Sequence, residues 1–390
     1  MNTGIDEESF REVLDTVQRF TRERLIPAER IVEEQDEVPE HIVSEMRDLG
    51  LFGLSIPREF GGLGLSLSQE IEVVAAVGQA ALAFRSVFGT NVGIGSQGIV
   101  IDGTDEQKCG WLPKLATGEV IASFALTEPD AGSDAASIRT RAEREGDHFV
   151  ITGTKRYITN ASRATILTLM ARTGSDGAGG ISAFIVPVAT PGVEVGKHDR
   201  KMGQHGTRTC DISLDGVRVP EAAIIGGPGN VNLGFKTAMK VLDRGRLHIA
   251  GLAVGQGRRL MNEICAYALE RKQFGSRIAD FQLVQAMIAD SETDLIAATA
   301  MTKAAALAFD NGQKIAREAA CAKLFATEAV GRIADRAVQI FGGAGYMSEY
   351  PIERIYRDVR LLRIYEGTSQ IQQIIIAKSV LNGFGQGERH

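Results

Sequence analysis

The 390-residue chain contains few of the residues that mark specialised classes of protein. Its four cysteines are far apart and form no CxxC pair, which argues against a disulfide framework and a cysteine-based metal site. None of the six histidines belongs to an HxxxH or HxH pattern, so we expect no metal site. Unpaired cysteines favour a reducing, cytoplasmic location.

An excess of positive charge and long apolar runs are also missing. The net charge is −6, so the chain lacks the basic field that holds nucleic acid or anionic lipid nonspecifically. No apolar run approaches the roughly 18 residues that a membrane-spanning helix needs. The first eight residues are acidic and contain no apolar core, unlike a signal peptide. We therefore expect neither nucleic acid nor a membrane as a partner.

Hydrophobic patterning divides the chain into three regions. Residues 1–120 are predicted to be helical. Residues 121–228 contain short β-type runs separated by turn signals such as Glu145-Gly-Asp147 and Asp215-Gly216, which predict a compact antiparallel β domain. Residues 229–390 return to long helices. The predicted fold class is α+β, mainly α.

One glycine pattern suggests a dinucleotide site. Gly93-Ile-Gly-Ser-Gln-Gly98 matches GxGxxG, which is meaningful only between a strand and a helix of a βαβ unit. Here the preceding segment is predicted to be helical, and the α–β–α order of the regions shows no strand–helix alternation. We therefore interpret these glycines as structural and reject a nicotinamide-binding Rossmann site.

The segment from Arg363 to Gln372, RIYEGTSQIQ, places one carboxylate at the start of a helix. Ser369 and Gln372 have the spacing of a capping box, and an apolar helical stripe follows. Glu366 would lie just before the first turn, on a bend that Gly367 permits. A carboxylate held there outside an ion pair suits a general base. The alternative is a residue that only favours the positive end of the helix dipole.

Three other segments combine glycines, hydroxyls and aromatic rings: FALTEPDAGSD at 124–134, KRYITN at 155–160 and QIFGGAGY at 339–346. Each alone is compatible with a structural role. Together with ERKQFG at 270–275 and IYEGTSQIQ, in this order, they resemble the acyl-CoA dehydrogenase family over residues 10–382. The resemblance implies an N-terminal helical domain, a middle β domain and a C-terminal four-helix bundle. It also implies FAD between the last two domains, and a homotetramer in which neighbouring subunits complete the cofactor site.

The resemblance further assigns residues to FAD. Those expected at the isoalloxazine ring are Phe124, Leu126, Thr127, Tyr157 and Thr159, the last near flavin N5. Those expected at the phosphates, the adenosine or the FAD of a neighbouring subunit are Ser133, Arg271, Gln273, Phe274, Gln282, Gln339, Ile340, Gly342, Gly343, Thr368 and Gln370. The fork of Arg271 suits a pyrophosphate, although a cation near a helix C-terminus is also favourable without any ligand.

For an acyl-CoA substrate, the resemblance implies contacts from Ser133, Asp243, Arg246 and the backbone N–H of Gly367. A near-neighbour ion pair on one helix face is the alternative for the two charged residues. Glu366 is expected to remove the α-proton while the β-carbon passes a hydride to flavin N5, giving a trans-2-enoyl-CoA.

Two effects act on the pKa of Glu366: the helix N-terminus stabilises the carboxylate, whereas burial against flavin and acyl chain raises the pKa. We expect burial to prevail once the substrate expels water, which strengthens the base when it is needed. Some family members carry the base at the position of Gly245, where glycine cannot serve, so Glu366 has no rival. Electron transfer flavoprotein is the oxidant that the resemblance implies.

Several residues are compatible with two roles. His205 stands where many family members have arginine, and it fits either polar packing or a second proton-transfer role. Phe84, Val87, Phe88 and Val92 suit an acyl pocket or an ordinary core equally well. An oxygen-using oxidase or monooxygenase on the same fold and a cofactor-free scaffold for acyl-carrier partners are the alternative functions. The acyl chain itself is not defined by the sequence.

Overall fold

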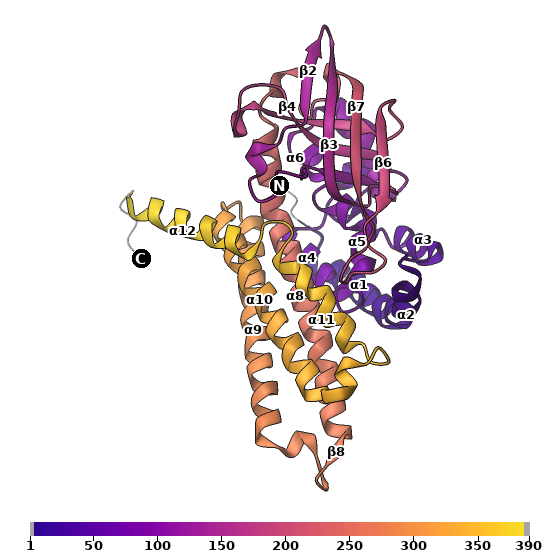
Figure 1. The fold of residues 1–390 in the computed structure, drawn as a ribbon, viewed down its shortest axis with the longest axis vertical. Helices are drawn as coiled ribbons and strands as arrows, with labels where there is room; N and C mark the ends of the chain where they lie inside the picture. Colours follow the sequence, from indigo (N-terminus) through magenta and orange to yellow (C-terminus); the bar gives the residue numbers. More distant parts are fainter. Residues whose placement is uncertain (1–3, 386–390) are drawn as a thin grey trace.

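The computed structural model of the chain describes residues 4–385. Figure 1 shows a β-sheet at one end, a bundle of long helices at the other, and the N-terminal helices beside their junction. The predicted fold class, mainly helical α+β with this order of regions, is confirmed. The exact domain boundaries remain a prediction. Within the described residues, no helix is long and apolar enough to cross a membrane.

From residue 4 onward, the N-terminal region is built from seven α-helices and short turns. A π-helical turn at Thr21–Leu25 separates the first two of these helices. Ser66 caps the helix that begins at Leu67, through a capping box with Gln69. The helices are α1 (Glu7–Phe20), α2 (Ile26–Gln35), α3 (Glu40–Asp48), α4 (Leu67–Val77), α5 (Leu82–Val92), α6 (Gln97–Asp102) and α7 (Asp105–Thr117).

The middle region is one seven-stranded sheet in the order β1-β4-β2-β3-β7-β6, with β5 paired to β4. The strands are β1 (Ala122–Ala125), β2 (Arg141–Glu145), β3 (His148–Thr159), β4 (Ile166–Arg172), β5 (Ile181–Pro187), β6 (Val193–His198) and β7 (Thr209–Pro220). Most pairings are antiparallel as predicted, but β4 pairs in parallel with β1 and with β2, so the sheet is mixed.

The tight turn predicted at Asp215-Gly216 is wrong. Both residues lie inside β7, which continues to Pro220. The register between β3 and β7 shifts there, so that Leu214 faces Gly153 and Val217 faces Ile151. Gly216 has a φ of 62°, and this left-handed residue forms a bulge instead of reversing the chain. A bulge and a turn need the same residue types, which is why the local sequence does not distinguish them.

The C-terminal region centres on three long helices, α8 (Gly234–Glu270), α9 (Gln282–Asp310) and α10 (Ala316–Phe341), with α11 (Ile352–Arg360) packed against α10. The glycines of α8 do not break it, because they permit close helix contact. A Cβ at Gly255 would stand 2.4 Å from the carbonyl oxygen of Ala75 on α4. The last helix, α12 (Ser369–Gly385), begins on α10 and then projects away from the bundle (Figure 1).

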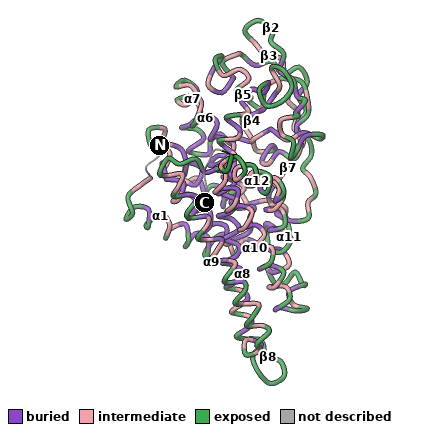
Figure 2. The backbone as a smooth tube through the Cα atoms, turned by 90° about the vertical axis from the view of Figure 1, so that its left-hand side faces the viewer, coloured by how far each residue is buried: buried purple, intermediate pink, exposed green. Residues whose placement is uncertain are grey.

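The two ends of the bundle differ in burial. In Figure 2 the buried backbone gathers where the bundle meets the N-terminal helices and the sheet, while the tip that carries β8 (Lys272–Gln273) and β9 (Ser276–Arg277) is exposed. Glu366 lies just before α12, toward the buried end. The junction of the three regions is therefore the place where a buried reaction centre can form.

Candidate active site

Glu366 lies in the connection between α11 and α12, on a strained backbone. Its φ is 51° and that of Gly367 is 92°, so two consecutive residues are left-handed. For a residue with a Cβ this conformation costs free energy and persists only where neighbours fix it. The Nζ of Lys323 and the Nε2 of Gln372 donate to the carbonyl oxygen of Gly367 at 2.7 and 2.9 Å. Helices α10 and α12 thus hold the bend.

The predicted capping box at the start of α12 is wrong. The hydroxyl of Ser369 donates to Glu328 at 2.6 Å instead of capping the helix. The Oγ1 of Thr368 accepts from the backbone N of Ile371 at 3.2 Å and takes over that role. Gln372 reaches back to the preceding loop. The charged acceptor on α10 draws Ser369 away, and the cap moves by one residue.

The carboxylate of Glu366 packs directly against α8. A Cβ at Gly245 would stand 2.0 Å from its Oε2, so only glycine leaves room for the carboxylate in this position. Oε2 is buried and accepts no hydrogen bond. Among the described residues, Glu366 belongs to none of the ion pairs within 4.0 Å. The expectation of a carboxylate held in place without a salt bridge is therefore confirmed.

Three cations surround this carboxylate at longer range. Burial raises the pKa of Glu366, and the charges of Arg85, Lys323 and Arg246 oppose part of that rise. Lys323 is fully buried, and burial lowers its pKa to about 8. A buried carboxyl with a raised pKa and an unused oxygen is suited to accept a proton.

Arg246 and Asp243 bind each other on one face of α8, as the near-neighbour alternative expected. Arg246 is almost fully buried, and its Nε has no hydrogen-bond partner. Burial raises the pKa of Asp243, with Arg246 as the opposing charge. The pair lies beside Glu366, since Arg246 is one of the charges that lower the pKa of that group. Their contact with a substrate remains a prediction.

The segments expected at the flavin ring lie side by side. The backbone N of Arg156 donates to the carbonyl of Thr127 at 2.8 Å, and the hydroxyl of Ser123 donates to the carbonyl of Thr159 at 2.7 Å. Tyr157, next to Thr159, has a φ of 58° and is 57% exposed. The end of β1, with Phe124 and Leu126, and the end of β3 therefore form one surface. Ser133 stands in the exposed loop that follows β1.

A buried ion pair locks these two segments together. The Nζ of Lys155 bonds Glu128 at 2.7 Å and the carbonyl of Leu126 at 3.1 Å, and Lys155 is fully buried. Glu128 also accepts from the backbone N of Arg139 and of Thr140. Burial lowers the pKa of Lys155 to about 8, with Glu128 opposing that fall.

A second group of predicted cofactor residues lies elsewhere. Arg271, Gln273 and Phe274 belong to the β8–β9 tip of the bundle, with Phe274 96% exposed, and Gln282 begins α9. The ring of Tyr267 near the end of α8 stacks on Phe341 at 4.0 Å, which brings the end of α10 to the same region. The remaining predicted residues there are Gln339, Ile340, Gly342 and Gly343.

Within one chain, the predicted FAD residues therefore fall into two groups that lie far apart. Thr368 and Gln370 stay beside Glu366 at the start of α12, while the tip residues lie at the far end of the bundle (Figure 1). The tip residues nevertheless fit a dinucleotide. Arg271 is exposed and forms no ion pair among residues 4–385. A Cβ at Gly342 or Gly343 would meet nothing within 4 Å, so a ligand can approach the backbone there.

His205 pairs with Glu33 on α2, its Nδ1 lying 3.0 Å from the carboxylate, which is a packing contact between segments. The GxGxxG glycines follow a helix, α5, so no βαβ unit surrounds them. The four apolar residues of the possible acyl pocket all lie in the core of the N-terminal region: Phe84, Val87, Phe88 and Val92.

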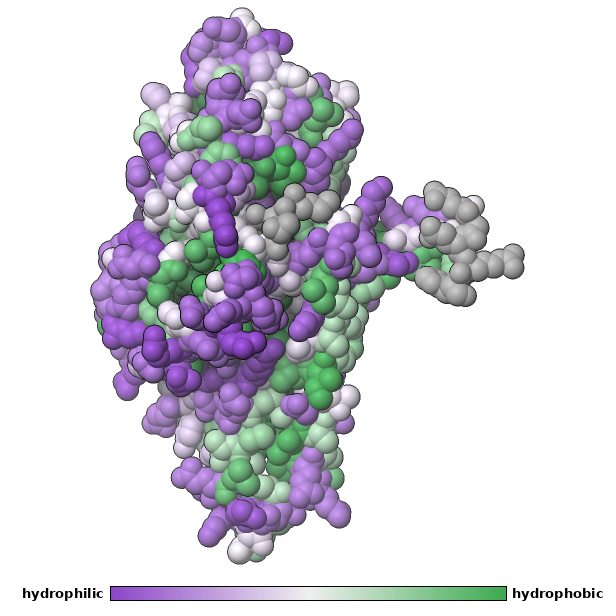
Figure 3. All heavy atoms as spheres, turned by 180° about the vertical axis from the view of Figure 1, so that it is seen from behind, coloured by the Kyte–Doolittle hydropathy of each residue, from purple (hydrophilic) through white to green (hydrophobic). Residues whose placement is uncertain are grey.

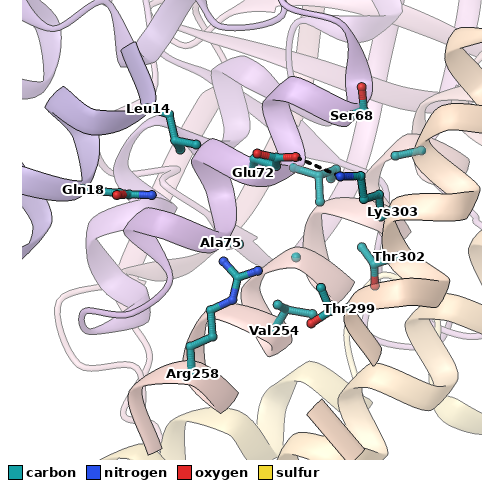
Figure 4. Close-up of a pocket in the computed structure, with 13 residues that line it drawn as sticks. Leu14, Gln18, Ser68, Glu72, Ala75, Val254, Arg258, Thr299, Thr302 and Lys303 are labelled. Carbon is teal, nitrogen blue, oxygen red and sulfur yellow. Dashed lines mark ion pairs between the residues drawn. The ribbon is translucent and has the colours of Figure 1, made fainter. Parts of the chain in front are cut away.

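A separate cavity of about 200 Å³ lies between α1, α4, α8 and α9 (Figure 4). Arg258 and an ion pair between Lys303 and Glu72 stand at its wall. None of the predicted site residues lines it. Among the described residues, no cluster of His, Cys, Asp and Glu could hold a metal ion.

The sequence patterns did not predict that two buried cations, Arg85 and Lys323, lie near Glu366. Arg85 stands alone among apolar residues in α5, and Lys323 stands in the alanine-rich face of α10. A single charged residue on an otherwise apolar helix face could have indicated both residues, because such a charge is buried on folding and then needs a polar or charged partner.

Similarity to known proteins extends over all three regions of the chain. Family models described as acyl-CoA dehydrogenase N-terminal, middle and C-terminal domains match residues 7–119, 123–217 and 232–381. The chain is 44% identical over 312 residues to a probable acyl-CoA dehydrogenase of Bacillus subtilis, covering 80% of each chain. It is 45% identical over 284 residues to the CarC subunit of the caffeyl-CoA reductase–Etf complex of Acetobacterium woodii, covering 73% of this chain and 74% of that protein.

The fold is similar to that of solved relatives as well. Butyryl-CoA dehydrogenase from Megasphaera elsdenii matches with a TM-score of 0.93 and 30% identity, over 97% of this chain and 99% of that one. The family is flavin-dependent, and its members are oxidoreductases. The chain belongs to the acyl-CoA dehydrogenase family.

Proposed function

We propose that this protein dehydrogenates an acyl-CoA thioester between its α- and β-carbons, with Glu366 as the base that removes the α-proton. The observation that carries the proposal is the state of its carboxylate. Oε2 is buried against Gly245 and accepts no hydrogen bond, and burial raises the pKa of the group. A base in this state loses no existing bond when it takes a proton.

The backbone beside Glu366 supports a second role. Among the hydrogen bonds of the described residues, neither the N–H of Glu366 nor that of Gly367 has an acceptor. Two neighbouring backbone N–H groups without an acceptor are available as donors to an oxyanion. We propose that they bind the thioester carbonyl oxygen and stabilise the negative charge that develops as the α-proton leaves.

FAD is the expected cofactor, and bound FAD would supply the hydride acceptor for the β-carbon. We propose that the surface made by β1 and β3 holds its ring, with Thr127 and Thr159 at the polar edge and Tyr157 over one face. Lys155 and Glu128 would keep these two segments in register. The start of α12, with Thr368 and Gln370, would bind the phosphates through helix N–H groups.

The separated tip residues lead us to propose that the working form is a homo-oligomer, with a tetramer expected. Arg271, Gln273 and Phe274 would then complete the FAD site of a neighbouring subunit. The bundle exposes apolar side chains suited to such a contact, which Figure 3 shows over the lower part of the molecule. Among the described residues, the exposed apolar side chains include Leu283, Ile296 and Leu307 on α9 and Leu381 and Phe384 on the projecting α12.

We propose electron transfer flavoprotein as the oxidant. This rests on the resemblance and on the complex with Etf named for the Acetobacterium relative. The four cysteines are free thiols, which suits the cytoplasmic location we propose.

The same relative favours a second candidate, the reduction of an unsaturated or arylacrylyl-CoA. In that direction Glu366 would deliver the proton to the α-carbon, and its raised pKa suits the protonated state as well.

Anaerobic mixing of the FAD-loaded protein with straight-chain, branched and aryl acyl-CoAs tests the proposal. We expect flavin bleaching with at least one saturated thioester and conversion to the enoyl-CoA. Glu366→Gln should keep FAD and lose the bleaching by several orders of magnitude. Bleaching of that variant at the wild-type rate would refute the assignment. Rapid oxygen consumption without an added acceptor would point to an oxidase instead.

A further inference from the structure

The connection between β6 and β7, residues 199–208, reaches from the sheet to α11. Within it, Gln204 is buried, with 1% of its surface exposed, and has a left-handed φ of 52°. Gln204 bonds Asp358 of α11 twice. Its backbone N donates to Oδ1 of Asp358, and its Nε2 donates to the carbonyl oxygen of Asp358 at 3.1 Å. A backbone conformation that costs free energy is thus held by a residue of another region of the chain.

The chain just before Gln204 also lies against α11. A Cβ at Gly203 would stand 2.8 Å from the carbonyl carbon of Arg357 and 2.8 Å from Oδ1 of Asp358, so glycine is what lets the loop approach so closely. The Nη1 of Arg357 donates to the carbonyl oxygen of Met202 at 3.2 Å. Three consecutive residues of the loop therefore contact the last turn of α11, and the contact fixes the middle region against the C-terminal region.

A short, hydrogen-bonded stretch of chain connects Asp358 to Glu366, which follows it by eight positions. Between them α11 passes into a tight turn at Leu361–Arg363, and the backbone N of Tyr365 donates to the carbonyl oxygen of the first residue of that turn at 3.2 Å. Burial raises the pKa of Tyr365, and a hydrogen bond with the side chain of Gln204 opposes part of that rise. Gln204 therefore contacts the residue directly before the proposed base.

The other end of the loop leads to the surface proposed for the flavin. The loop runs into β7, where Thr209 pairs with Thr159 of β3. The carbonyl oxygen of Arg208 accepts from the backbone N of Asn160 at 2.9 Å. Thr159 is proposed at the polar edge of the ring, and Gln204 precedes Arg208 by only four positions. One short loop thus joins the proposed flavin surface to the segment that carries the base.

We infer that Gln204 is a positioning residue, which together with Asp358 sets the place of the Glu366 carboxylate relative to the flavin. This rests on the proposed role of Glu366 and on the proposed flavin surface. The reaction needs a base on one side of the Cα–Cβ bond and a hydride acceptor on the other, and here the two belong to different regions of the chain. A misplacement of about 1 Å between reacting groups lowers a rate by about 100-fold. A contact between the regions beside Glu366 prevents such a shift.

Gln204→Ala tests the inference on the FAD-loaded protein, because alanine keeps a Cβ on the left-handed backbone and removes only the side-chain bonds. Flavin reduction is followed by anaerobic rapid mixing with the saturated acyl-CoA that bleaches the wild type fastest. We expect the limiting rate to fall about tenfold or more, with the dissociation constant of the acyl-CoA unchanged. Arg200→Ala, an exposed residue of the same loop, is the matched control. Weaker binding at an unchanged limiting rate, or no effect at all, would overturn the inference.

Asp358 allows a test by rescue. Asp358→Asn keeps an oxygen that can accept from the backbone N of Gln204, whereas Asp358→Ala removes it. Arg354, which stands 3.9 Å from Asp358, keeps its pair with Glu29 at 2.8 Å in both variants. We expect Asp358→Asn to retain most of the wild-type rate and Asp358→Ala to fall as far as Gln204→Ala. Equal losses in the two variants would overturn the inference, since the charge of Asp358 and not its contact with the loop would then matter.

Hydrogen exchange separates this inference from the proposed reaction, because it needs no substrate. Exchange of backbone amides is followed by mass spectrometry in peptides that cover residues 202–208 and 364–368. We expect Gln204→Ala to speed exchange in both peptides and Arg200→Ala to leave the second unchanged. This result would support the inference even if Glu366→Gln proved fully active, which would count against the proposed base alone. Unchanged exchange of 364–368 in Gln204→Ala would overturn the inference. If Asp358→Ala does not fold, Gln204→Ala decides by itself.

Discussion

The carboxylate of Glu366 fills the space that a side chain at Gly245 would need: its Oε2 lies 2.0 Å from where a Cβ on residue 245 would stand. The two positions are 121 residues apart in the sequence. A side chain on one therefore excludes the carboxylate of the other, and the glycine on α8 is as necessary to the arrangement as the glutamate on the loop.

Gly245→Ala tests this relationship. The new methyl group would displace the carboxylate, because real Cβ atoms do not approach an oxygen so closely. We expect kcat to fall about 100-fold or more, as misplacement of a reacting group by about 1 Å does, with FAD content unchanged. Gly110→Ala on α7, where a Cβ would meet nothing within 4 Å, is the control and should be fully active. Full activity of Gly245→Ala would show that Glu366 works from another position.

Glu366→Gln should stabilise the protein at neutral pH. Burial raises the folded pKa of Glu366 above its unfolded value. The stability that the neutral carboxyl contributes is therefore complete below the unfolded pKa and is lost as the pH rises through the folded pKa. Glutamine stays neutral, so we expect a Tm higher than wild type by about 2 °C at pH 7. The difference should shrink toward pH 4, and a difference independent of pH would contradict the pKa shift.

Lys323 should affect both the position and the pKa of Glu366. Its Nζ holds the carbonyl of Gly367, and its charge lowers the pKa of Glu366. Lys323→Met removes both effects, so the acid limb of the pH profile of kcat/KM should move to higher pH and kcat should fall about tenfold. Lys378→Met on the exposed part of α12 is the matched control. A reduced kcat with an unmoved acid limb would leave Lys323 a purely structural role.

Removing one charge of the buried pair between Lys155 and Glu128 should lower the free energy of unfolding strongly. Glu128→Gln leaves a fully buried ammonium without its counter-charge, and we expect a loss of about 3 kcal/mol or more in unfolding free energy, with weaker FAD binding. Glu145→Gln breaks a pair with Arg218 in which both side chains are more than half exposed, and should cost less than about 1 kcal/mol. Chemical denaturation and FAD titration measure both, and similar losses in the two variants would contradict a locking role.

The sequence predicted those features that depend on local pattern. The three-region order follows from periodicity, and the bend at Glu366 follows from Gly367 and the apolar stripe after it. The prediction of a capping box was wrong because Glu328, which is distant in sequence, accepts the hydrogen bond of the Ser369 hydroxyl. The prediction of a tight turn at Asp215-Gly216 was wrong because a bulge requires the same residue types as a turn.

Other features could not be predicted because they arise only in the folded chain. Arg85, His248 and Glu70 come together across as many as 178 positions, and nothing near any one of them shows that the others are its partners. The same holds for Lys323, whose contact with Gly367 joins two helices.

The central claim is that Glu366 takes the α-proton, and proton exchange measures this step without hydride transfer. The FAD-loaded protein is mixed in deuterium oxide with a 3-thia-acyl-CoA, in which sulfur replaces the β-carbon so that no enoyl product can form. Loss of the α-proton is then followed by mass spectrometry. The account predicts rapid exchange with the wild type and none above background with Glu366→Gln. Exchange at the wild-type rate in that variant would mean that another group is the base.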